Sequence, residues 1–167
     1  VIADAKANPR YIAADLLSQA EHDTLACSIL LTPSQDIAEK VAVEVDKQLA
    51  KLSRNEIAKK SIESYGRIVV TETMEEAIDL ANEIAPEHLE LAVENPFDYL
   101  NKIRNAGAIF LGEYSPEPLG DYFAGPNHTL PTSGTAKFAS PLSVDAFIKK
   151  SSVIYYTREA LSSVKDK

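Results

Sequence analysis

The sequence predicts an α/β fold, with a largely parallel β-sheet and helices on both of its faces. Short apolar runs rich in β-branched residues alternate along the chain with amphipathic segments of ten or more residues. Connections of that length between successive strands are crossovers, which make neighbouring strands parallel, and parallel sheets bury both faces. The 167 residues and the hydrophobic content of 45% suit one domain of this kind.

The first three predicted elements lie before residue 32. Val1-Ile2-Ala3 reads as the end of a strand whose front is missing. Asn8 and Pro9 form a helix start, with an N-cap and a first-turn proline, and predict a helix over residues 9–21. An apolar strand over 26–31 follows, and the lone Cys27 within it is expected to be a small buried hydrophobe.

Capping patterns predict the starts of two further helices. Thr32 and Gln35 are spaced as a capping box before an apolar stripe at helical spacing, and Thr73 and Glu76 repeat that pattern. The other predicted elements are a helix over 56–65 ended by Gly66, strands over 67–71, 89–93 and 108–111, and a helix from Asn95-Pro96 to Gly107. This alternation supports the α/β prediction, and we describe the expected fold as an incomplete Rossmann-like domain.

Helical and strand periodicity is absent from residues 112–134, where glycine and proline are concentrated. Ordered loops of this length are uncommon and are usually functional. Beyond the loop, Phe147-Ile148 and residues 153–156 are expected to form short strands, as a hairpin. We therefore predict a single α/β domain over 1–157, followed over 158–167 by the start of a C-terminal helical segment of a longer protein.

Composition excludes several classes of function. The net charge of −8 and the absence of clustered Lys and Arg argue against a nucleic-acid partner. No run approaches the roughly 20 apolar residues that span a bilayer, and no secretory signal is visible, so we expect a cytoplasmic protein without a membrane partner. The sequence also lacks a GxGxxG turn, a P-loop, a CxxC pair and an HExxH motif.

Each of the three histidines has an acid or amide residue beside it. Imidazole together with carboxylate or amide oxygen suits zinc binding or proton transfer. Gln19 and His22 are three residues apart, so on a helix their side chains share a face and could converge on one ion. A solvated helix end, with His22 near the last carbonyls, accounts for the same spacing.

Glu87 and His88 follow the helix-ending Pro86 at the start of a strand. A histidine that titrates near neutrality suits an alcohol proton, and a carboxylate suits the activation of water. An exposed turn is the alternative. Asp121 and His128 lie within the glycine- and proline-rich loop, whose backbone could approach a ligand closely, although such a loop can also satisfy its own polar groups.

Three segments taken together resemble the histidinol dehydrogenases. They are DLLSQAEHD at 15–23, APEHLE at 85–90 and GDYFAGPNHTLPT at 120–132, and they occur in the same order as in that family. The resemblance covers nearly the whole chain. It implies zinc-dependent oxidation of L-histidinol through the aldehyde to L-histidine, the end of histidine biosynthesis, with NAD⁺ as the acceptor in both oxidation steps.

The resemblance also implies roles for individual residues. Gln19, His22 and Asp121 correspond to zinc ligands that also contact the substrate. His88 corresponds to the general base, Glu87 to the residue that activates water and contacts substrate, and His128 to a further substrate contact. Zinc would hold and orient the substrate without accepting electrons, and hydride would leave to NAD⁺.

The family pattern continues beyond both ends of this sequence. The resemblance places much of the NAD-binding region upstream, so the cofactor-binding residues are unknown here, and it places a fourth zinc ligand, a histidine, downstream. Family members build their sites at a homodimer interface. We therefore expect the 167-residue chain to be inactive by itself.

The order of the elements raises a geometric question. His22 and His88 precede strands, whereas the loop that carries Asp121 and His128 follows one, and ligand sites of parallel sheets usually lie at the carboxyl ends of strands. Either the loop crosses the sheet, for which the roughly 33 Å reach of ten extended residues is sufficient, or two subunits meet.

Two alternative functions fit the same residues. A zinc hydrolase could use His, Asp and Gln ligands with a glutamate that activates water. A non-catalytic α/β module for assembly would need no metal. Other divalent ions also accept nitrogen and oxygen ligands, so the ligand set alone does not select zinc.

Overall fold

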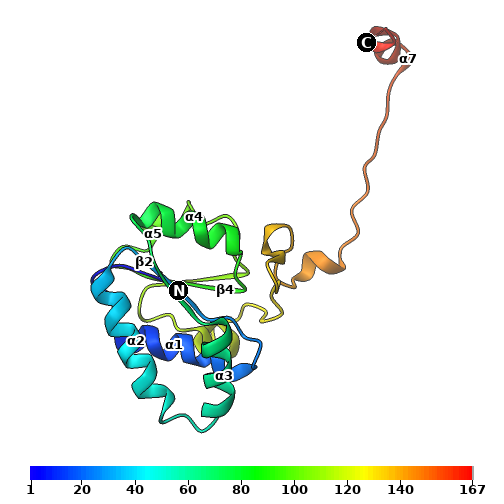
Figure 1. Ribbon diagram of the computed structural model, residues 1–167. Helices are drawn as coiled ribbons and strands as arrows, with labels where there is room; N and C mark the ends of the chain where they lie inside the picture. The colour runs from blue at the N-terminus through cyan, green and yellow to red at the C-terminus, as the bar shows by residue number, and fades with distance from the viewer. Residues whose placement is uncertain (167) are drawn as a thin grey trace.

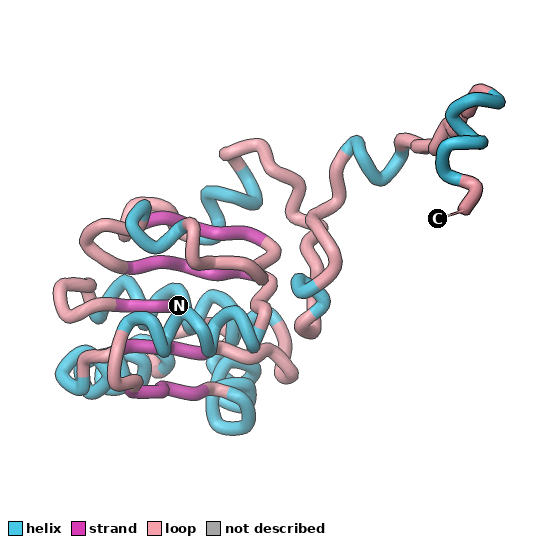
Figure 2. Tube along the Cα trace, turned by 90° about the horizontal axis from the view of Figure 1, so that it is seen from above, coloured by secondary structure: helices cyan, strands magenta, loops and turns pink. Residues whose placement is uncertain are grey.

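The computed structural model describes residues 1–166, and the side chain of Asp121 lies outside the described part. Five parallel strands form one sheet in the order β3-β2-β1-β4-β5. Their bounds are β1 Ile2–Ala3, β2 Ile29–Thr32, β3 Arg67–Val70, β4 His88–Ala92 and β5 Ala108–Leu111. Figure 2 shows the strands side by side. The predicted parallel α/β fold is confirmed.

Helices cover both faces of the sheet, as predicted. The helices are α1 Pro9–His22, α2 Gln35–Leu49, α3 Asn55–Tyr65, α4 Met74–Ile84, α5 Phe97–Leu100, α6 Glu117–Tyr122 and α7 Arg158–Val164. In Figure 1, α1, α2 and α3 lie on one side of the strands, whereas α4 and α5 lie on the other. Short 3₁₀ turns at Thr135–Lys137 and Val144–Phe147 follow the loop.

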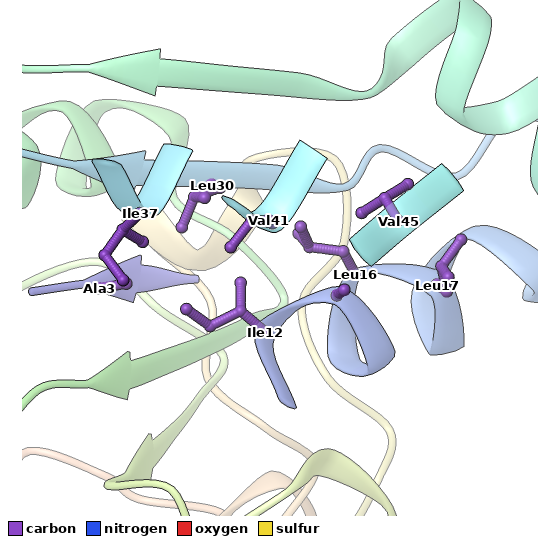
Figure 3. Close-up of a cluster of buried hydrophobic side chains, with 9 residues drawn as sticks. Ala3, Ile12, Leu16, Leu17, Leu30, Ile37, Val41 and Val45 are labelled. Carbon is purple, nitrogen blue, oxygen red and sulfur yellow. The ribbon is translucent and has the colours of Figure 1, made fainter. Parts of the chain in front are cut away.

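Alternation along each strand divides the core into two clusters. Ala3 and Leu30 pack with α1 and α2, and Figure 3 shows this cluster, which includes Ile12, Leu16, Leu17, Ile37, Val41 and Val45. Ile2 and Leu31, the neighbouring strand residues, pack on the opposite face with α4. Because β1 and β2 have α-helical cover on both sides, they carry apolar residues at successive positions.

The cap of α2 differs from the predicted Thr32–Gln35 capping box. Ser34 is the N-cap, and its side chain accepts the backbone N–H of Ile37 at 3.3 Å. Thr32 instead ends β2, where its carbonyl accepts the N–H of Thr71. The Thr32 hydroxyl accepts the backbone N–H of Ser34 at 3.1 Å instead of an N–H of the first helical turn, and the helix starts two residues later than predicted. The cap at Thr73 is confirmed: its hydroxyl accepts the N–H of Glu76, whose carboxylate accepts the N–H of Glu72.

The predicted helix from residue 95 to Gly107 is much shorter in the structure, where α5 spans only Phe97–Leu100. Asn82 explains this difference. Its buried side chain accepts the N–H groups of Arg104 and Asn105 and donates to the carbonyl of Lys102. These bonds satisfy the turn after α5 without helix continuation.

Three other expectations are also wrong. Cys27 is exposed rather than buried, and its thiol donates to the carbonyl of Tyr65 at 3.4 Å. The loop at 112–134 contains α6, although periodicity predicted no element there. Neither Phe147-Ile148, where a 3₁₀ turn ends, nor residues 153–156 form a strand, so the predicted hairpin is absent from the described residues. Figure 1 shows residues 151–157 leading away from the sheet to α7, which begins near the predicted position.

Candidate active site

Gln19, Glu87 and His88 line one cavity of about 380 Å³ at the amino-terminal edge of the sheet. His88 is the first residue of β4, and Gln19 lies in the last turn of α1. The cavity also borders the start of β2 and the end of α4. Three residues singled out from the sequence are therefore brought together by elements that are far apart along the chain.

The backbone next to Glu87 is shaped by Ala85 and Pro86. Ala85 ends α4 in the left-handed conformation, with φ of 51°, and its N–H donates to the carbonyl of Ala81. Left-handed backbone at a residue with a Cβ costs about 1–2 kcal/mol. Pro86 cannot continue the helix, so the chain turns there and directs Glu87 and His88 into the cavity wall.

His88 is the most unusual side chain of the site. Both ring nitrogens are buried, and among the described residues neither has a hydrogen-bond partner. The imidazole lies near the ring of Phe110, with centroids 6.0 Å apart and planes tilted by 40°. A buried polar group without a partner costs about 1–3 kcal/mol, which a ligand that pairs with it would recover.

The end of the long loop returns to this edge of the sheet. Thr132, Ser133 and Gly134 line the cavity. A Cβ built on Gly107, just before β5, would lie 2.6 Å from the Glu87 carbonyl oxygen and 3.1 Å from Cδ of Pro131. Gly107 therefore lets the returning loop pack closely beside Glu87.

His22 and His128 lie apart from this cavity. His22 ends α1 and is exposed, one helical turn beyond Gln19, and His128 is exposed in the loop, where Asn127 accepts the N–H of Thr129. Neither histidine lines the described cavity. Asp121 belongs to α6, and the position of its side chain lies outside the described part.

These positions bear on metal binding. Among the described side chains, no group of three or more His, Cys, Asp or Glu residues gathers closely enough to hold a metal ion. Gln19 and His22 supply suitable donor atoms from one helix, but two ligands do not complete the tetrahedral set that zinc prefers. The described residues of this chain therefore do not by themselves form a zinc centre.

A second cavity, of about 630 Å³, lies at the carboxyl edge between β1 and β4, where the strand order reverses. Dinucleotides bind at this position in doubly wound folds. Here the wall carries Asp4, Glu94 and Glu113, and its lysine, Lys6, pairs with Glu94 at 2.6 Å. This acidic surface does not fit the pyrophosphate of NAD.

Sequence reasoning missed the residues between the two cavities. Asp15 and Glu90 line both cavities, and a hydrogen bond joins their carboxyl groups. Burial is the main cause that raises the pKa of Glu90 to about 8, and burial also raises the pKa of Asp15. The only sequence signal was a pair of acidic residues at otherwise inward-facing positions of α1 and β4.

Comparison with known proteins identifies the family. The family model described as histidinol dehydrogenase matches residues 1–167. The chain belongs to the histidinol dehydrogenase family. The resemblance noted in the sequence is thereby confirmed.

Several histidinol dehydrogenases are close relatives of the chain. The protein from Caldanaerobacter subterraneus subsp. tengcongensis is 64% identical over 99% of the chain, and that from Halalkalibacterium halodurans is 66% identical over 96% of it. The crystal structure of histidinol dehydrogenase from Elizabethkingia anophelis superimposes with a TM-score of 0.89, at 44% identity over 99% of the chain. The chain spans 38% of the length of each of these relatives.

No helix among the described residues is long and apolar enough to cross a bilayer.

Proposed function

We propose that the chain forms part of an enzyme that oxidises L-histidinol to L-histidine through the aldehyde. The observation that supports this proposal most directly is the buried His88 imidazole, which has no described partner and borders a cavity shared with Gln19 and Glu87. The family to which the chain belongs favours a dehydrogenase over the zinc hydrolase that the same residue types would allow.

His88 is proposed as the general base. A neutral imidazole has a free nitrogen that can accept the hydroxyl proton of an alcohol, and the low polarity beside Phe110 strengthens a hydrogen bond to a substrate. Glu87 is adjacent in the same wall and is proposed to take a proton from the water that adds to the aldehyde. Gln19 is proposed to contact the substrate from α1.

Zinc and NAD are proposed as cofactors of the longer protein, with zinc orienting the substrate and NAD⁺ accepting hydride. His22 and Asp121 are proposed with Gln19 as zinc ligands, and His128 as a substrate contact. A homodimer is proposed as the active assembly, since the described residues complete neither cofactor site.

Steady-state reduction of NAD⁺ by L-histidinol tests the proposed reaction. In a polypeptide that carries this chain and spans the full family length, we expect His88→Asn to lower kcat by about 10²–10⁴-fold, because the general base is lost. Glu63→Gln, an exposed change on α3, is the matched control and should leave kcat unchanged. Wild-type kcat in His88→Asn would contradict the assignment, and turnover by the 167-residue chain alone would contradict the proposed need for the rest of the protein.

Calorimetric titration of zinc into the 167-residue chain tests the ligand assignment. We expect weak binding that His22→Ala lowers further, because only Gln19 and His22 share a helix face. His128→Ala, which removes an exposed histidine of the loop, is the control and should bind as the wild type does. Equal binding by the wild type and His22→Ala would show that His22 is not a zinc ligand in this chain.

A further inference from the structure

Asp15 and Glu90 form a carboxyl pair that connects α1 to β4. The Glu90 carboxyl donates to the Asp15 carboxylate, an arrangement that needs one proton on the pair because two ionised carboxylates have no donor. Burial raises the pKa of both groups, and the proximity of Asp15 raises that of Glu90 further. The pair therefore shares a single proton at neutral pH.

Two further groups near Glu90 belong to Val1, just before β1, and to α6. The backbone nitrogen of Val1 lies near the pair and donates to the carbonyl of Ile29 at 2.8 Å. The backbone N–H of Glu117, the first residue of α6, donates to the Glu90 carboxyl. Glu90 thus makes contacts with two different elements, α1 and α6.

The geometry of α1 and β4 connects this pair to the candidate site. Leu89 and Leu91 face α4, so alternation directs His88 and Glu90 to the face covered by α1. The two residues are about 6.6 Å apart along the strand, and Asp15 and Gln19 are about 6 Å apart along the helix. Because α1 crosses back over parallel strands, the contact of Asp15 with Glu90 brings Gln19 opposite His88.

The bond to Glu117 acts on the same site from α6. Gly120 packs so closely on Phe110 that a Cβ there would lie 2.6 Å from Cε1 of the ring. Phe110 in turn lies beside His88. Glu90 therefore helps to hold α6, which carries Asp121, against the aromatic wall of His88.

We propose that Asp15 and Glu90 are positioning residues, whose contact between the two cavities holds α1, β4 and α6 in the register that the candidate site requires. Buried polar pairs are seldom the most stable choice for a core, but they can specify one register among several. The role rests on the proposed function, because it assumes that Gln19 and His88 act together.

Nuclear magnetic resonance of the 167-residue chain tests this proposal without histidinol or NAD. The readouts are hydrogen exchange at the Glu117 amide and the ¹⁵N chemical shifts of the His88 imidazole. We expect Glu90→Leu to speed exchange at Glu117 by about tenfold or more, as for loss of a hydrogen bond to a buried group, and to shift the His88 resonances. Glu90→Gln, whose amide can make both bonds, should restore both readouts, and the control Glu94→Gln should change neither.

Unchanged Glu117 exchange and unchanged His88 shifts in folded Glu90→Leu would overturn the proposal. If Glu90→Leu does not fold, the test is the pH dependence of the ¹³C chemical shifts of the wild-type Asp15 and Glu90 carboxyl groups. If the chemical shifts of both carboxyl carbons change over the same pH range, and this coupling is abolished by Glu90→Gln, the shared proton is supported. If each carboxyl group titrates independently near its ordinary pKa, the proposal is overturned. None of these readouts depends on catalysis. A result against the proposed oxidation of histidinol is therefore distinguishable from a result against the positioning role of Asp15 and Glu90.

Discussion

His88 and Glu90 lie two residues apart on β4 and represent two ways to bury a polar side chain. Glu90 satisfies its carboxyl with Asp15 and Glu117, whereas the nitrogens of His88 have no partner among the described residues. Unsatisfied buried groups are rare in folded proteins and are concentrated at functional sites. The contrast indicates that Glu90 supports the structure and that His88 remains available to a ligand.

The pH dependence of stability should report the state of Glu90. Its pKa is about 8 in the folded chain, against an ordinary value of 4.5, so the folded state binds the extra proton between these pH values. The contribution of the Glu90 carboxyl to the free energy of unfolding is fully present below pH 4.5. It decreases as the pH rises and is lost above about pH 8. We expect urea unfolding to show that the free energy of unfolding decreases by up to roughly 5 kcal/mol across that interval.

Glu90→Gln should remove this decrease, because the amide does not titrate. Glu39→Gln, which changes an exposed carboxylate on α2, is the control and should keep the wild-type slope. If stability of the wild type rises between pH 4.5 and 8, the proton is not bound at Glu90.

At the scale of elements, local patterns located most helices and strands but not their ends. The Thr73 cap was predictable because its hydroxyl and Glu76 lie within one turn. The short α5 was not predictable, because Asn82 acts on it from a helix some 20 residues earlier along the chain. Similarly, α6 depends on contacts with Phe110 and Glu90 rather than on periodicity.

Gly120→Ala tests how closely α6 packs on β5. In an unconstrained helix this change stabilises by about 0.5–1 kcal/mol. Here the added Cβ would lie 2.6 Å from Phe110, so we expect a loss of about 1–3 kcal/mol in urea unfolding and faster hydrogen exchange in α6. The same change in a Phe110→Leu background should cost less, since the smaller side chain leaves room; equal losses in both backgrounds would exclude this contact as the cause.

At the scale of the whole molecule, the C-terminal segment differs from the body. Val153, Ile154 and Tyr155 are more than 80% exposed, as is the ring of Phe138. Figure 1 shows this segment extended between the body and α7. Exposed apolar side chains in this number are typical of interaction surfaces, which agrees with the proposed homodimer. The predicted domain division at residue 157 and the cytoplasmic location stay predictions.

Sedimentation velocity tests whether this segment associates. We expect the chain to form concentration-dependent oligomers, and the double change Val153→Ser and Ile154→Ser to shift it toward monomer, because apolar burial drives such contacts. Ser151→Ala, an exposed change in the same segment, is the control. Equal association of both variants would place the interface elsewhere.

Local sequence patterns were sufficient to predict the α/β class, the order of most strands and helices, and the residue types at Gln19, Glu87 and His88 that indicated the family. These features follow from periodicity, capping and short motifs, which act over a few residues. Three features became visible only in the folded chain: these three residues share a cavity at the amino-terminal edge of the sheet, the end of the loop returns to that cavity, and Asp15 contacts Glu90. Contacts between elements distant in sequence depend on how the layers pack, and no local pattern encodes that packing.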